Sequence, residues 1–84
     1  MARNLLGEIQ SRMTDFSKSQ KLISNYILEN YDKAAYMTAA RLSETVGVSE
    51  STIVRYATEL GFDGYPELQH SLQEMVRTKL TSVQ

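Results

Sequence analysis

Several residue types that carry chemistry are absent or scarce in this chain of 84 residues. It has no cysteine, which excludes a disulfide framework and a cysteine-based metal site. Its single histidine, His70, cannot hold a metal alone, so we expect neither a metal nor another cofactor. No apolar run approaches the roughly 18 residues of a membrane span, and the N-terminus does not resemble a secretory signal. The simplest interpretation is a cytoplasmic protein with no membrane partner.

An excess of positive charge is also lacking. The nine Lys and Arg face ten Asp and Glu, for a formal net charge of −1 and a pI ≈ 5.7. Because neutralisation of phosphates by basic side chains supplies most non-specific DNA affinity, one isolated copy should bind nucleic acid weakly. Stronger binding would need a dimer, a second attached domain, or basic residues from elsewhere in the chain, and Arg12, Lys18 and Lys21 are available.

Signals for catalysis are lacking too. Ser, His and Asp all occur, but no spacing places them as a triad, and no glycine-rich loop is present to hold a phosphate. A chain of this length forms one small domain with a modest core, which leaves little room for a substrate pocket. We therefore expect a protein that is not an enzyme.

The most informative stretch that is present is residues 38–58, TAARLSETVGVSESTIVRYAT. It predicts two short helices, 39–46 and 50–60, joined through Gly47, which supplies the positive φ of a tight turn. Gly61 is predicted as the glycine turn that ends the second helix. Each helix is preceded by a residue whose hydroxyl can accept a bond from an unpaired backbone N–H: Thr38 and Ser49. Ser43 is small enough to let two steeply crossing helices approach, and the predicted core residues where they touch are apolar: Leu42, Val46, Val48, Ile53 and Tyr56. This is the pattern of a helix-turn-helix.

A plain helical corner in a small bundle would share part of this pattern. The outward side of the second helix favours DNA binding, because it carries short polar side chains and an arginine where a structural helix more often has Glu, Lys or Ala. The residues concerned are Ser49, Glu50, Ser51, Thr52 and Arg55.

The rest of the chain predicts three more helices: one at about 4–13, one that begins at 18 and ends within 30–33, and one at about 66–80. Ser17 and Gln20 form a capping box at the start of the second. The apolar face of the first, with Leu5, Ile9 and Met13, is either core or a dimer contact. Residues 34–37 are expected to form an apolar connector packed under the helix-turn-helix. The fold class is all-α: a five-helix bundle around a homeodomain-like three-helix core, without the two-stranded wing of a winged helix.

Four segments of the chain carry a resemblance to a known family. They are FSKSQKLISNYILEN, MTAARLSETVGVSESTIVRYATELGF, the turn GFDGYPEL and the long helix that follows, together covering about residues 16–72. In these segments the chain resembles the N-terminal helix-turn-helix domain of the RpiR family of bacterial transcription regulators. The resemblance implies a sequence-specific DNA-binding domain at residues 1–80, with double-stranded DNA as its partner.

The resemblance also implies features outside the chain. Family members carry a C-terminal sugar-isomerase-like domain that binds a phosphosugar and sets whether the regulator represses or activates genes of sugar metabolism. Residues 81–84 are expected to be a frayed tail leading to that domain, which makes the chain a piece of a longer regulator. A homodimer or higher homo-oligomer is expected, and the phosphosugar effector would act only through the absent domain.

Candidate DNA contacts follow from the placement of the second helix of the motif in the major groove. Ser49 and nearby backbone N–H groups would meet a phosphate, and Ser51 and Thr52 would meet base edges or phosphates. Arg55 would contact guanine or a phosphate, or instead pair with Glu59 or Glu50 within its own helix. Glu50 would accept from a cytosine amino group or complement the helix dipole. Phosphate contacts are further expected from four residues: Arg41, Thr38, Lys18 and Lys21.

The chain departs from the family pattern where basic residues often end the recognition helix, since Thr58, Glu59 and Asp63 stand there. This lowers the expected phosphate affinity. The alternative function is a helical protein–protein interaction or dimerisation module that has lost DNA binding. Such a module would use the face of Leu5, Ile9 and Met13, or the face of Leu72, Val76 and Leu80.

Overall fold

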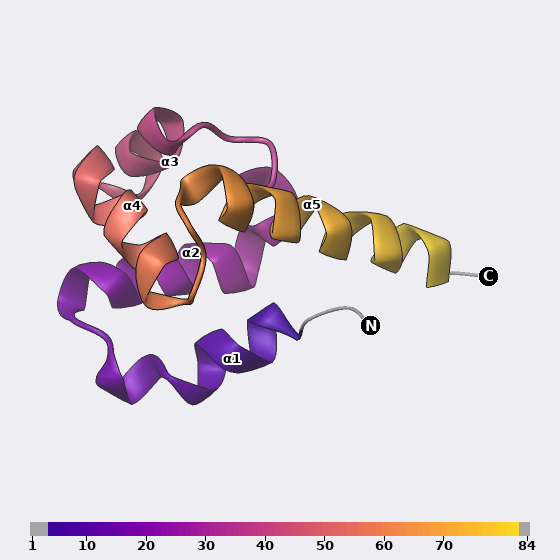
Figure 1. Ribbon diagram of the computed structural model, residues 1–84, viewed down its shortest axis with the longest axis horizontal. Coiled ribbons are helices and arrows are strands. Elements are labelled where there is room, and N and C mark those ends of the chain that lie inside the picture. Colours follow the sequence, from indigo (N-terminus) through magenta and orange to yellow (C-terminus); the bar gives the residue numbers. More distant parts are fainter. Residues whose placement is uncertain (1–3, 83–84) are drawn as a thin grey trace.

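A computed structural model of the chain describes residues 4–82, and within them it is entirely helical (Figure 1). The elements in chain order are α1 (Leu5–Ser11), the 3-10 turn η1 (Met13–Asp15), α2 (Lys18–Ala34), α3 (Ala39–Val46), α4 (Glu50–Glu59) and α5 (Tyr65–Ser82). The predicted all-α class with five helices is confirmed. Between α4 and α5 the chain makes only a short turn, and residues 4–82 contain no strand.

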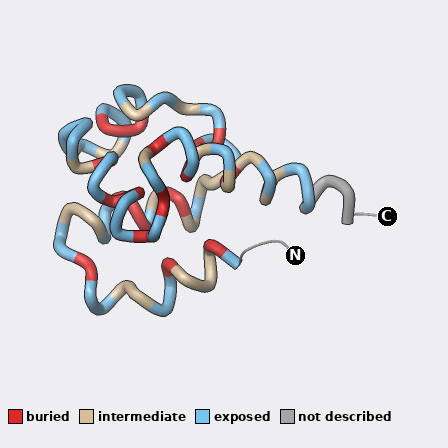
Figure 2. Tube along the Cα trace, in the orientation of Figure 1, coloured by how far each residue is buried: buried red, intermediate tan, exposed pale blue. Residues whose placement is uncertain are grey.

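The core lies between α2, α3 and α4, which contact one another, while α5 packs on α2 and α4 and α1 lies along α2. Figure 2 shows the buried residues gathered on the inner sides of these helices. The largest side chains with almost no exposed surface come from all five helices: Leu5, Ile9, Ile23, Ile27, Leu42, Ile53, Tyr56, Leu68 and Leu72. The homeodomain-like three-helix core is thus enlarged by one helix at each end.

The first helix is shorter than predicted. It ends at Ser11 instead of Met13, and the chain then turns through η1 so that Phe16 enters the core with 6% of its surface exposed. Leu5 and Ile9 are fully buried. Of the two predicted uses of this face, core packing is therefore confirmed for these two residues.

Helix α2 begins as predicted and ends later than predicted. The Ser17 hydroxyl accepts from the Gln20 N–H (3.3 Å), and the Gln20 side chain accepts from the Ser17 N–H (2.9 Å), which is a complete capping box. The helix passes through a kink at Asn30 (φ −138°, ψ 41°) and continues to Ala34. The predicted connector was wrong for Tyr36, whose side chain lies on the surface with 67% exposed.

Helix α5 fixes the connector that precedes α3. The Tyr65 hydroxyl donates to the carbonyls of Met37 (2.6 Å) and Ala34 (3.3 Å), and Gln69 Nε2 donates to the Met37 carbonyl (2.8 Å). Burial raises the pKa of Tyr65 to about 12. These bonds engage the carbonyl of Ala34, the last residue of α2, and that of Met37 in the connector, and so tie α5 to the segment that leads into α3.

Both predicted turn glycines adopt the left-handed conformation. Gly47 (φ 92°) ends α3, and its N–H and that of Val48 both donate to the Ser43 carbonyl (2.8 and 3.0 Å). Gly61 (φ 94°) follows α4. Helix α5 continues to Ser82, two residues beyond the predicted end, whereas residues 83–84 of the expected tail lie outside the described part.

Candidate DNA-binding surface

One side of α4 is fixed in the core. Ile53, Tyr56 and Ala57 have no exposed surface. The Tyr56 hydroxyl shares a hydrogen bond of 2.8 Å with the buried Ser24 hydroxyl of α2, and its ring lies 5.5 Å from that of Phe16. Burial raises the pKa of Tyr56 to about 12, while the Ser24 bond and the charge of Arg12 act in the opposite direction. The prediction that Tyr56 is a core residue is confirmed, and α4 has a single possible orientation toward solvent.

The opposite side of α4 is open to solvent along its whole length. Apart from Glu59 at the C-terminal end, its exposed residues are Glu50, Ser51, Val54, Arg55 and Thr58, and we call these five the outer face of α4. Their spacing of three and four residues places them in one stripe. Glu50, Ser51 and Arg55 were predicted as DNA contacts from the sequence, whereas Val54 and Thr58 were not. A helical projection of residues 50–59 would have found both, because the buried positions leave only this stripe facing outward.

A cluster of hydroxyl groups lies at the start of α4. The Ser49 hydroxyl accepts from the Thr52 N–H (3.2 Å) and lies within hydrogen-bond distance of the hydroxyls of Thr52 (2.7 Å) and Ser51 (3.1 Å). Ser49 and Ser51 are exposed, whereas Thr52 is half-buried. The predicted cap is present, and among the three hydroxyls that of Thr52 is the least accessible.

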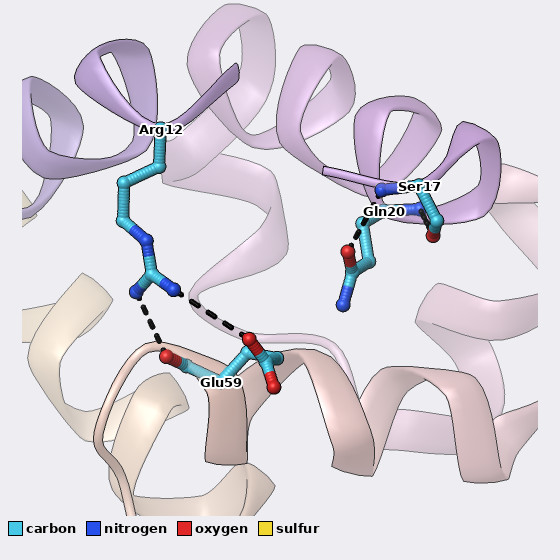
Figure 3. A network of polar contacts seen from close by, with 4 residues as sticks. All are labelled: Arg12, Ser17, Gln20 and Glu59. Atoms are coloured by element: carbon cyan, nitrogen blue, oxygen red, sulfur yellow. Dashed lines mark hydrogen bonds and ion pairs between the residues drawn. The ribbon is translucent and has the colours of Figure 1, made fainter. Parts of the chain in front are cut away.

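Arg55 does not make the intrahelical pair that local spacing offers. Glu59 instead pairs with Arg12, whose guanidinium donates to the Glu59 carbonyl (2.8 Å) and lies 3.5 Å from its carboxylate (Figure 3). The same guanidinium stands 5.7 Å from the centre of the Phe16 ring. Arg12 is therefore bound to the C-terminal end of α4. It is not the unpaired basic residue that the sequence offered for phosphate neutralisation. Within the described residues, the Arg55 side chain has no hydrogen bond or ion pair.

Helix α3 contributes a second exposed arginine. The Thr38 hydroxyl accepts from the Arg41 N–H (3.1 Å), so Thr38 caps α3 as predicted. The side chains of Thr38 and Arg41 are both exposed, and the Arg41 guanidinium has no partner among the residues described. The first turn of α3 and the outer face of α4 thus present two arginines that are free to meet an external anion.

Lys18 and Lys21 belong to the first turn of α2 and not to the helix-turn-helix itself. Both are exposed, and α2 begins two residues after Phe16, whose ring contacts that of Tyr56.

Over residues 4–82, no group of His, Cys, Asp and Glu has the arrangement of a metal site, and no helix is long and apolar enough to cross a membrane.

Comparison with known families and proteins gives a consistent picture. Residues 3–79 match the model of the helix-turn-helix domain of the rpiR family. The chain is 36% identical over 72 residues to the transcriptional regulator HexR of Pseudomonas aeruginosa, covering 86% of this chain and 25% of that protein. It is 32% identical over 76 residues to the regulator YfhH of Escherichia coli, covering 90% and 27%. The chain thus spans about a quarter of the length of these relatives.

Solved structures share the same arrangement of helices. The Vibrio vulnificus NanR protein, complexed with ManNAc-6P, superposes with a TM-score of 0.85 at 31% identity, over 95% of this chain and 31% of that one. The N-terminal domain of the ybbH protein from Bacillus subtilis superposes with a TM-score of 0.78 at 26% identity, over 86% of this chain and 88% of that one.

Proposed function

This chain belongs to the rpiR family of helix-turn-helix domains and is the DNA-binding part of a transcriptional regulator, and we propose that it reads its site by placing the outer face of α4 in the major groove. The observation that carries this proposal is the division of α4 into a buried side and one exposed stripe. A recognition helix needs both, because the buried side sets its orientation and the exposed side reads the bases.

Each candidate residue has a role in this proposal. Arg55 and Glu50 face base edges, with Arg55 matching the acceptor pair of guanine and Glu50 the amino group of cytosine. Ser49 and Ser51 meet a phosphate at the positive end of α4, and Thr52 supports their arrangement through its bond to Ser49. Phosphates on either side are held by a second set of residues: Thr38, Arg41, Lys18 and Lys21.

The regulator's wider role follows from its relatives. Its relatives HexR and YfhH are more than three times the length of this chain, and the related NanR protein was solved with a sugar phosphate bound. We propose that residues 1–80 act together with a sugar-phosphate-binding domain, and that the regulator controls genes of sugar or phosphosugar metabolism. A homodimer would present two copies of α4 to two half-sites of the DNA. The second copy would compensate for the weak attraction to DNA expected of one copy with a net charge of −1.

The experiment that tests this function is an NMR titration of the chain with a mixed-sequence DNA duplex at low salt, following the backbone amides. We expect shifts concentrated at Arg41 and at residues 49–58, reversed by added salt because phosphate contacts release counterions. Shifts confined to α1 and α5, or none at concentrations that detect weak binding, would contradict the proposal. Of the two faces suggested for a protein-interaction module, Leu5, Ile9 and Leu72 are fully buried, and Met13 and Val76 are half-buried against the core. The side chain of Leu80 lies outside the described part.

A further inference from the structure

Val54 is an apolar side chain in the middle of a polar stripe. It leaves 43% of its surface exposed, and within the described residues only Leu22 on α2 and Tyr36 in the connector are comparable among large apolar residues. Val54 takes no part in the hydrophobic core cluster, nor in the shell of half-buried residues around it. On the outer face of α4 it is surrounded by polar neighbours, with Glu50 and Ser51 one turn before and Thr58 one turn after.

Folding does not explain the choice of valine at this position. A β-branched residue is a poorer helix former than Ala, Leu or Glu, because the preceding turn restricts its χ1 angle. With no core partner to contact, it gains little from burial in the free protein. An exposed valine fixed in one rotamer on a rigid helix is, however, well suited to meet an apolar group of a ligand.

The major groove displays one such group, the 5-methyl of thymine. We propose that Val54 is a specificity-determining residue that packs against the methyl group of a 5-methylpyrimidine in the DNA site. This inference rests on the proposed insertion of α4 into the major groove. It divides the reading of the site between two adjacent residues, since Arg55 recognises hydrogen-bond acceptors and Val54 recognises a methyl group.

The neighbouring contacts support this division. The Thr58 hydroxyl donates to the Val54 carbonyl (3.1 Å), so it is directed along the helix and away from a base. The Ser51 hydroxyl is drawn toward Ser49 at the start of the helix (3.1 Å). The central part of the stripe therefore offers a base pair two side chains without internal partners, Val54 and Arg55.

The test uses DNA that differs from the natural base by the methyl group alone. Duplexes are first selected from a random-sequence library by binding to the wild-type chain. Each thymine of a selected duplex is then replaced in turn by deoxyuridine, and the dissociation constants are measured for the wild type and for V54A. The matched control is L22A, which removes an equally exposed apolar side chain (44%) from α2. Circular dichroism checks that both variants remain folded.

We expect one thymine at which uracil weakens wild-type binding about fourfold, the factor that corresponds to the burial of one methyl-sized group. In V54A this difference should vanish at that position, whereas L22A should keep it. If the wild type binds its selected duplex but no thymine shows this pattern, the Val54 inference fails and the proposed function stands. If the wild type selects no sequence at all, both are overturned.

Discussion

Arg55 is the residue whose loss should most directly change sequence recognition. Its guanidinium is exposed on the outer face of α4 and has no partner among the described residues, so its removal leaves no unpaired group inside the fold. We expect Arg55→Ala to cost about 1–3 kcal/mol of binding to a selected duplex, with little loss on unrelated DNA. Fluorescence anisotropy on the two duplexes measures this difference. An equal loss on both would contradict a base contact.

Arg41 serves as the comparison, because a phosphate contact carries no sequence information. Arg41→Ala should weaken binding to both duplexes by a similar factor. It should also lower the slope of log affinity against log salt by about 1. Circular dichroism should be unchanged in both arginine variants, since neither side chain supports the core.

Tyr56 should make the stability of the fold sensitive to alkaline pH. Its pKa is raised to about 12 in the folded state, against about 10 in an unfolded chain. The stabilisation is therefore complete below about pH 10 and is lost as the pH rises toward 12, with a slope approaching 1.4 kcal/mol per pH unit. Urea unfolding of the wild type at several alkaline pH values measures the combined loss from Tyr56 and from Tyr65, whose pKa is raised likewise.

Tyr56→Phe removes the titrating hydroxyl and keeps the ring. The variant should be less stable at neutral pH, because the buried Ser24 hydroxyl loses its partner. Its stability should nevertheless fall less steeply above pH 10, leaving mainly the contribution of Tyr65, whose pKa is also raised to about 12 by burial. Equal alkaline slopes for the wild type and the variant would refute the role of Tyr56.

Residue roles divide into those that local rules predict and those that they do not. Ser49 and Tyr56 were predicted correctly as a cap and a core residue, because capping and helical periodicity depend on positions three or four apart. The ion pair of Glu59 was not predicted, since spacing along the helix pointed to Arg55 and the actual partner, Arg12, is 47 residues away. Val54 was not predicted as a contact because it is apolar and adjoins Ile53, a core residue, in the sequence. Only its angular position on the helix separates the two.

At the scale of elements, Arg12 links the segment after α1 to the end of α4. Its guanidinium holds the last carbonyl and the carboxylate of α4 at Glu59. Arg12→Ala should lower the free energy of unfolding by about 1 kcal/mol, because the pair is partly solvated and screened while the bond to the carbonyl is charge-assisted. Urea unfolding gives this value, and amide exchange should quicken in the last turn of α4.

The control for this variant is Arg77→Ala. Arg77 contacts Glu74 at 3.2 Å within α5, and both side chains are largely exposed. Its removal should change stability by less than about 0.5 kcal/mol, as for other surface substitutions. Equal effects of the two variants would mean that the contact between Arg12 and α4 adds nothing beyond a surface charge.

The helices themselves were predicted well where their ends carry local signals. The capping box at Ser17 marks the start of α2, and the cap at Thr38 and the glycine at Gly47 mark the two ends of α3. Gly61 marks the turn that follows α4. The kink at Asn30 lies at the start of the stretch where the helix was predicted to end, but the helix continues past it to Ala34. The early end of α1 carries no local signal, and the Phe16 that follows it packs against Tyr56, 40 residues further along the chain.

At the scale of the whole molecule, net charge sets the limit on affinity. The chain carries −1 overall, and residues 38–65 hold two arginines against four carboxylates. Pairing with Arg12 neutralises one of these carboxylates, Glu59, at the end of the recognition helix. Few phosphate contacts remain for one copy, so its affinity should depend only weakly on salt compared with a strongly basic domain.

Two linked copies should overcome this limit only when the DNA offers two half-sites. A flexible tandem fusion of the chain gives the second copy an effective concentration near millimolar, which raises affinity by roughly 10²- to 10⁴-fold where both copies can bind. We expect this gain on a duplex with two half-sites about one helical turn, 10–10.5 bp, apart, and almost none on a single half-site. Anisotropy titrations of the fusion and the single copy on both duplexes test this.

A similar gain on the single half-site would show that linking two copies raises their affinity for any DNA. The net negative charge of the chain argues against that outcome. A gain confined to the paired site would instead show that this small acidic domain obtains its affinity through two correctly spaced α4 helices.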